Sequence, residues 1–198
     1  MTKVVGITGG IGSGKTTLSA HLINKGYLVH ESDKVVSSMY NKPKKAFINF
    51  IKKNISSDAV LKNKINKKQI INIIFDNQKA RIRLEKYIHK EVKSSRNKFI
   101  QKNLNAKKKI IFVDIPLLLE NKLEKKFDLV VCVISSKKNR TNRVLKNKKF
   151  TKKILNKIFS AQTSDKERKK RSQIIIKNNK SKKDFIFNAE KALIGLIK

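Results

Sequence analysis

The sequence has a single cysteine, few acidic side chains and no tryptophan. Cys132 alone can form neither an intramolecular disulfide nor a cysteine metal site, and its place in the apolar run 129–134 is typical of a buried strand. No segment approaches the roughly 20 consecutive apolar residues of a membrane span. The N-terminus enters a strand pattern at once, without the regions of a signal peptide. We therefore expect a cytoplasmic protein with no membrane partner.

Aromatic residues are also scarce, at 7% of the chain, which indicates a core packed with isoleucine, leucine and valine. The hydrophobic share of 39% is large enough to build such a core, so the composition favours a folded protein over disorder. At 198 residues the chain is long enough for one α/β domain with insertions and too short for two full-sized domains. We expect one compact unit and a monomer.

The shortage of acid, 14 Asp and Glu against 49 Lys and Arg, gives a formal net charge of +35. Such a charge attracts any polyanion, including nucleic acid, anionic membranes and phosphorylated metabolites. The lysines are scattered among many asparagines and isoleucines and form no single basic arm, so a compositional bias of the genome is the favoured explanation over a dedicated nucleic-acid surface. We expect no dedicated nucleic-acid partner.

Apolar runs of strand length recur along the chain, at 3–8, 27–30, 109–114, 128–134 and 174–176. Helical spacing follows the first run at 16–25 and closes the chain at 185–197. Runs that are apolar throughout are typical of strands buried on both faces, as in parallel sheets. The pattern predicts an α/β fold with a parallel five-stranded sheet flanked by helices.

The segments between these strands are helical in pattern and divide the chain. We assign residues 1–33, 106–136 and 171–198 to the sheet core, 34–105 to a helical insertion and 137–170 to a basic helical lid. Within the insertion, the polar stretch 54–66 predicts a loop and 83–99 predicts an amphipathic helix. Pro116 cannot continue a sheet ladder, so we expect a turn or a helix to begin there.

A glycine-rich motif follows the first predicted strand. Gly9-Gly10-Ile11-Gly12-Ser13-Gly14-Lys15-Thr16 matches G-x-x-x-x-G-K-[ST] in full, which makes the fold of the P-loop NTPase type. Its glycines let amides converge on phosphate oxygens, and the lysine reaches the β- and γ-phosphates of ATP. The predicted nucleotide-binding residues are Gly10, Ile11, Gly12, Ser13, Gly14, Lys15, Thr16 and Thr17. The alternative is a glycine-rich turn that matches the pattern by chance.

Two aspartates lie at the carboxyl ends of predicted strands, where parallel sheets carry their catalytic groups. Asp33 could face the γ-phosphate and accept the proton of an acceptor hydroxyl, or it could cap a helix that begins at Lys34. Asp114 stands where P-loop enzymes carry the acid that helps to hold Mg²⁺, and a helix cap is again the alternative. Together, Thr16 and Asp114 are the predicted metal-binding residues, and Glu120 could hold a loop or a basic side chain.

The lid segment carries a dense group of cations, namely Arg140, Arg143, Lys146, Lys148 and Lys149. Such a group could bind phosphates on closure, and a solvated basic face is the more ordinary alternative. Arg140 and Arg143 stand out because a guanidinium group binds phosphate in a bidentate manner. On the helix pattern of the insertion, His89 could pack, orient a neighbour or bind a ligand, and its position does not decide among these roles.

The run 6–17 resembles the nucleotide loop of the dephospho-CoA kinase family almost letter for letter, including a Thr-Gly-Gly-Ile prefix that generic P-loops lack. Further motifs similar to that family follow in order and spacing over nearly the whole chain. They are Glu31-Ser32-Asp33; Phe75-Asp76 with Arg81, Leu84, Glu85 and His89; Asp114-Ile115-Pro116-Leu117-Leu118-Leu119-Glu120; Arg143; and Ala161-Gln162 with Ile176 and Asn178.

The resemblance implies transfer of the ATP γ-phosphoryl group to the ribose 3′-hydroxyl of dephospho-CoA, with Mg²⁺ as the metal. It implies Asp33, Lys15 and Arg143 as catalytic residues, with Asp33 as the base, and Arg140 as a further nucleotide ligand. The helical insertion would receive the acceptor. The implied substrate-binding residues are Thr8, Asp33, Arg81, His89, Pro116, Leu117, Leu118 and Glu120.

The chain departs from the family pattern at a few positions, which are Glu31, Lys90, Asn147 and the pair Ser172-Gln173. Asn147 replaces an arginine, which removes one planar phosphate-binding group from the lid. A kinase for another nucleotide or nucleoside is the nearest alternative function. A GTP switch or a nucleic-acid-binding protein is more distant, because the guanine-reading Asn-Lys-x-Asp pattern and an aromatic-interleaved basic patch are absent from the sequence.

Overall fold

The computed structural model describes residues 1–147 and 150–197, which leaves Lys148 and Lys149 of the lid cation group outside the described residues. The chain forms two compact units, one of residues 1–31 and 100–198 and one of residues 32–99. The expectation of one compact unit therefore differs from the structure. The physical reason is that the inserted segment has enough apolar residues to form a core of its own.

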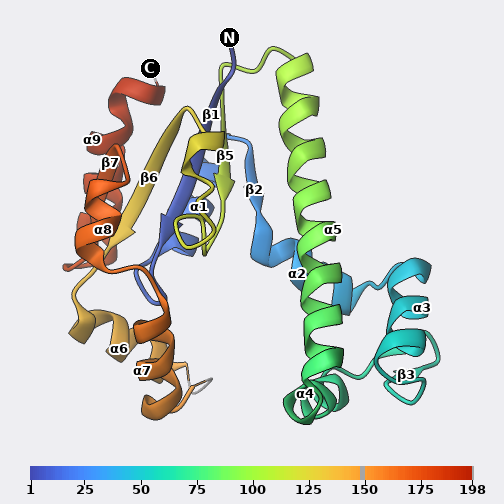
Figure 1. Cartoon of the computed structure of the whole chain (residues 1–198). Helices are drawn as coiled ribbons and strands as arrows, with labels where there is room; N and C mark the ends of the chain where they lie inside the picture. The colour runs from blue at the N-terminus through green and yellow to red at the C-terminus, as the bar shows by residue number, and fades with distance from the viewer. Residues whose placement is uncertain (148–149, 198) are drawn as a thin grey trace. The chain divides into compact units, whose positions relative to one another are not determined.

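The first unit is built on a five-stranded sheet with the order β2-β5-β1-β6-β7 (Figure 1). Its strands are β1 (Lys3–Gly9), β2 (Val29–Glu31), β5 (Ile110–Asp114), β6 (Leu129–Ile134) and β7 (Ile174–Lys177). All neighbouring strands pair in parallel, which confirms the predicted fold class. Since parallel neighbours cannot be joined by tight turns, each connection is long enough to carry helices across the sheet.

The helices of this unit cover the sheet and follow its strands. They are α1 (Lys15–Asn24), the 3₁₀ turn η1 (Glu124–Lys126), α6 (Lys137–Lys146), α7 (Lys152–Ala161), α8 (Asp165–Lys170) and α9 (Lys182–Ile197). On α9, Phe185, Ala189 and Leu193 recur at four-residue intervals, so they share one buried face. That face packs with Leu18 and Leu22 of α1 in the main core.

The central strand β1 ends between two neighbours whose register fixes the functional edge of the sheet. Ile7 lies opposite Asp114 of β5, and Gly9 lies opposite Val133 of β6. On the other side of β5, Glu31 is also in register with Asp114. The loop after β1 therefore leaves the sheet at the same edge as Asp114, where open parallel sheets place their ligands.

The second unit is mainly helical. It contains α2 (Ser32–Asn41), α3 (Lys45–Asn54), the short strands β3 (Val60–Leu61) and β4 (Lys64–Ile65), α4 (Lys67–Asp76) and most of α5 (Gln78–Asn105). Its core joins Phe47 and Ile51 of α3 to Ile70 and Leu84. The ring of Phe47 also stacks on that of Tyr87, with centroids 5.5 Å apart.

Two expectations for this unit were incomplete. The stretch 54–66, predicted as a loop, contains the antiparallel pair β3-β4, closed by Lys62 and Asn63 with φ of 45° and 61°. Two central residues of positive φ are typical of a tight hairpin turn, but lysine gives no sequence signal for one. The helix predicted at 83–99 is α5, which is longer at both ends because polar residues continue it beyond the apolar pattern. Within the described residues, no helix has the length and hydropathy to cross a membrane.

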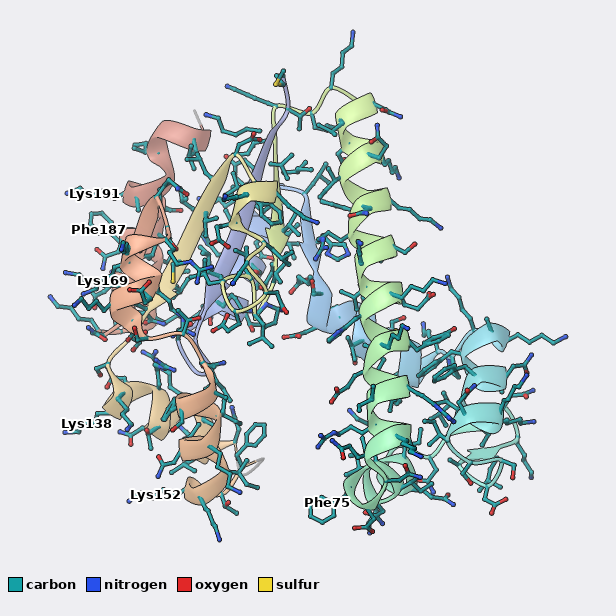
Figure 2. All side chains as sticks on the ribbon, viewed as in Figure 1. Phe75, Lys138, Lys152, Lys169, Phe187 and Lys191 are labelled. Carbon is teal, nitrogen blue, oxygen red and sulfur yellow. The ribbon has the colours of Figure 1, made fainter. Side chains whose placement is uncertain are left out.

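Two phenylalanines of α9 give a matched test of the core. Phe185 is 1% exposed in the main cluster, whereas Phe187 is 66% exposed and projects outward from α9 in Figure 2. We expect Phe185→Ala to lower the free energy of unfolding by about 3–5 kcal/mol, because it leaves a cavity. Phe187→Ala should change it by less than about 0.5 kcal/mol. Urea denaturation of both variants measures the difference, and equal losses would contradict the described packing.

Candidate active site

The loop between β1 and α1 presents a group of free amides. Gly14 precedes the first turn of α1 with φ 107°, and Gly12 has φ 73°, so both occupy the left-handed region that favours glycine. Among the described residues, the main-chain N–H groups of Gly12, Gly14, Lys15 and Thr16 donate to no protein acceptor. Amides that converge at a helix N-terminus form a site for a phosphate group.

The carbonyl groups of the same loop are held from the other side. The carbonyl oxygens of Ile11, Gly12 and Ser13 accept hydrogen bonds from Arg140 Nε (3.0 Å), Arg143 Nη1 (3.3 Å) and Asn178 Nδ2 (2.8 Å) in turn. In a planar trans peptide the N–H of the next residue points away from the carbonyl oxygen. The N–H groups of Gly12 and Gly14 therefore point away from the side chains that hold the preceding carbonyl groups, Arg140 and Asn178.

A buried ion pair lies beside the loop, at the end of β5. Lys15 Nζ donates to Asp114 Oδ1 at 2.6 Å, and Ser19 Oγ donates to Asp114 Oδ2 at 2.8 Å. Lys15 is 9% and Asp114 is 4% exposed, so each charge depends on the other for compensation. The helix-cap alternative for Asp114 is wrong, because residues 116–122 form turns and no helix begins directly after Asp114.

The two arginines of α6 support the loop in this structure. Arg140 is 6% exposed, and burial lowers its pKa, an effect that the nearby carboxylate of Asp165 opposes. Its guanidinium also lies over the ring of Phe159, 4.6 Å from the centroid. Arg143 donates to Ser135 Oγ (3.2 Å) and to the carbonyl oxygen of Asn178 (3.0 Å). Both were expected to bind phosphate, and direct contact with phosphate stays a prediction.

Comparison with known proteins agrees with this geometry. The family model described as dephospho-CoA kinase matches residues 3–184. A dephospho-CoA kinase of Fusobacterium nucleatum is 32% identical over 191 residues, which are 95% of each chain. The chain belongs to the dephospho-CoA kinase family. The predicted family is thereby confirmed, and with it an ATP-dependent kinase that uses a nucleotide and a metal.

Solved structures of low sequence identity share the fold of this kinase. A crystal structure of a Thermus thermophilus protein aligns with a TM-score of 0.77 at 24% identity, covering 100% of this chain and 98% of that one. A dephospho-CoA kinase from Campylobacter jejuni aligns with a TM-score of 0.73 at 22% identity, covering 98% of this chain and 96% of that one. The same fold therefore extends over nearly the full length of this chain and of both solved structures.

The predicted base of the kinase, Asp33, is exposed in the first turn of α2. Its carboxylate makes no hydrogen bond or ion pair within the described part of the chain, so it caps no helix there. Asp33 belongs to the second compact unit and follows Glu31, the last residue of β2, by two positions. The carboxylate is thus available to a ligand.

The turn after β5 divides the predicted substrate residues. Leu118 is fully buried, and its Cδ1 would lie 2.7 Å from a Cβ at Gly6, so in this conformation it packs the core and does not face a ligand. Leu117 is 43% exposed, and the carbonyl oxygen of Pro116 accepts a long hydrogen bond from Thr8 Oγ1 at 3.5 Å. Glu120 performs both roles considered for it, accepting from a loop amide and from a buried arginine.

The other predicted substrate residues, Arg81 and His89, lie on α5 with exposed side chains. Arg81 approaches Glu85 at 3.9 Å, one helical turn away. Packing is the wrong explanation for His89, because its ring is exposed. The sequence analysis missed Ser19, which a helical projection could have found, since position i+4 places it on the same face of α1 as Lys15.

Gly14 provides a test of the loop geometry. A Cβ at this position would lie 2.1 Å from Asn178 Nδ2, and the φ of 107° is unfavourable for any other residue. We expect Gly14→Ala to lower the free energy of unfolding by at least about 2 kcal/mol, from backbone strain and the displaced amide. As a matched control, Gly195→Ala on α9 meets no atom within 4 Å and should stabilise by up to about 1 kcal/mol. Thermal and urea unfolding compare the two variants.

Proposed function

We propose that this kinase transfers the γ-phosphoryl group of ATP to the ribose 3′-hydroxyl of dephospho-CoA, giving CoA and ADP in the last step of coenzyme A biosynthesis. The match of residues 3–184 to the dephospho-CoA kinase family is the observation that carries the proposal. The free amides of the loop support it, because they suit an anion of high charge. We further propose that the protein acts as a cytoplasmic monomer.

The nucleotide is assigned to the loop. The amides of Gly12, Gly14, Lys15 and Thr16 would bind its phosphate oxygens. Their predicted neighbours Gly10, Ile11, Ser13 and Thr17 complete the site, and the amides of Ile11, Ser13 and Thr17 donate to acceptors within the protein. Lys15 would leave Asp114 to reach the β- and γ-phosphates, and Arg143 would neutralise the charge that develops during transfer. The segment 137–170 is proposed as the lid, and 1–33, 106–136 and 171–198 as the nucleotide-binding core.

Mg²⁺ fits the oxygen donors beside the loop. Thr16 is exposed on the first turn of α1 and its hydroxyl has no partner within the described residues, while Asp114 offers a carboxylate at the end of β5. One or two protein oxygens together with substrate phosphates are the usual ligands of Mg²⁺ in phosphoryl-transfer sites. Bound there, the metal supplies positive charge to the β- and γ-phosphates.

The acceptor is assigned to the insertion 34–105 and to the turn after β5. Asp33 would accept the proton of the 3′-hydroxyl, and its free, exposed carboxylate supports this role. The exposed side chains of Arg81, His89 and Leu117 are proposed to contact dephospho-CoA. Thr8, Pro116 and Glu120 are proposed to hold the turn in place beside it.

An acceptor panel tests the proposed substrate. We expect ADP release from ATP and Mg²⁺ with dephospho-CoA and only background release with adenosine, AMP or pantothenate, because the insertion would bind the whole acceptor. A coupled spectrophotometric assay for ADP measures all four acceptors. Turnover with AMP and none with dephospho-CoA would show a kinase for another nucleotide.

Two substitutions separate nucleotide binding from proton transfer. Asp33→Asn should lower kcat about 10²–10⁴-fold with little change in the Kd for ATP, since it removes only the base. Lys15→Ala should lower kcat by orders of magnitude and also weaken ATP binding, because a phosphate ligand is lost. Asp58→Asn, at an exposed site in the same unit as Asp33, is the matched control and should leave both values unchanged. An Asp33→Asn variant with the kcat of wild type would contradict the assignment of Asp33 as the base.

A further inference from the structure

The joint between α7 and α8, residues 162–164, is attached to the nucleotide loop by a side chain that the mechanism above does not use. Gln162 follows the last residue of α7, and its Oε1 accepts the main-chain N–H of Ile11 at 3.1 Å. Ile11 is 151 positions away in sequence and stands in the middle of the glycine loop. Its amide is thus tied to the joint and not to another loop residue.

The carbonyl group of Ile11 is held by Arg140, which also contacts Gln162. Arg140 Nε donates to the Ile11 carbonyl oxygen at 3.0 Å, and Arg140 Nη2 donates to Gln162 Oε1 at 3.4 Å. The two side chains therefore hold both peptide groups that flank the Cα of Ile11 and contact each other. We call this arrangement the Gln162–Arg140 clamp.

A network of charges around two buried arginines, Arg140 and Arg168, fixes the clamp from behind. Asp165 Oδ1 accepts from Arg140 Nη1 at 3.4 Å and from Arg168 Nη1 at 3.2 Å. Arg168 is 2% exposed and donates to Glu120 Oε1 at 3.0 Å, the same oxygen that accepts the Thr163 N–H at 2.9 Å. Because separating a buried charge from its partners costs free energy, Arg140 is held in one orientation.

We propose that Gln162 is a positioning residue for the nucleotide loop. The clamp fixes the peptide group between Ile11 and Gly12, and the trans geometry of that group then aims the Gly12 N–H toward the phosphate site. A loop held in its binding conformation loses less conformational entropy when phosphate binds, so affinity rises. By linkage, a bound nucleotide also stabilises the joint between α7 and α8. This inference rests on the proposed function of the loop.

The first experiment measures the Kd for ATP by titration calorimetry. Gln162→Leu keeps the size of the side chain and removes the acceptor, so we expect ATP to bind at least about tenfold more weakly. Gln162→Glu keeps an acceptor oxygen that can pair with Arg140 and should bind within about threefold of wild type. Gln162 is partly exposed and lies outside the hydrophobic core, so neither change opens a cavity there.

The chain offers a matched control for lost glutamine acceptors. Gln173 Oε1 accepts the main-chain N–H of Val130 at 2.8 Å, a bond that holds the start of β6. Gln173→Leu should therefore affect thermal stability and leave the Kd for ATP unchanged. An equal loss of ATP affinity in Gln173→Leu and Gln162→Leu would overturn the proposal, because it would show a general loss of stability.

The second experiment uses protein without nucleotide and follows hydrogen exchange of the Ile11 amide by NMR. We expect exchange to be at least about tenfold faster in Gln162→Leu than in wild type, and near the wild-type rate in Gln162→Glu. Unchanged exchange in Gln162→Leu would overturn the clamp. A wild-type protein that binds no ATP would instead contradict the proposed function, and the exchange rates would still decide whether the clamp exists.

Discussion

The conformation of residues 11–13 depends on one constraint, which is that their carbonyl oxygens are held by side chains from other segments. Arg140, Arg143 and Asn178 supply the donors, and the planar trans peptide then sets the direction of the amides. A glycine loop without such donors has many accessible conformations, because glycine loses more entropy on ordering than other residues. Helix α6 and the residue that follows β7 thus give the loop a defined shape.

The large positive charge of the chain has a different meaning inside the molecule than on its surface. Arg140, Arg168 and Lys15 are almost fully buried, and each pairs with a carboxylate. Only 14 residues of the chain are acidic, and three of them, Asp114, Glu120 and Asp165, pair with these buried cations. The scattered surface lysines need no such partners, since water solvates them. The net charge of the chain therefore gave little information about function. The ion pairs of Lys15 and Arg140, by contrast, lie beside the nucleotide loop.

Local pattern predicted most of the fold and part of the site. The apolar runs and the glycine motif predicted the parallel sheet, the loop and the helix after it, because each feature is set by neighbouring residues. Prediction failed at positions where the adjacent residues in the sequence gave no indication of the local structure. The turn at Lys62 and Asn63 has no glycine, and Leu118 reads as part of a family motif while its side chain fills the space above Gly6.

The sequence by itself determined the order of the strands along the chain, the nucleotide loop and the family to which the chain belongs. Only the tertiary structure decided which side chains hold that loop, since Gln162 meets Ile11 across 151 positions and Arg140 meets it across 129. Local periodicity gives the face of a helix on which a residue lies. It gives no information on the partner that the face meets, because that partner is chosen by how distant segments pack around a common core.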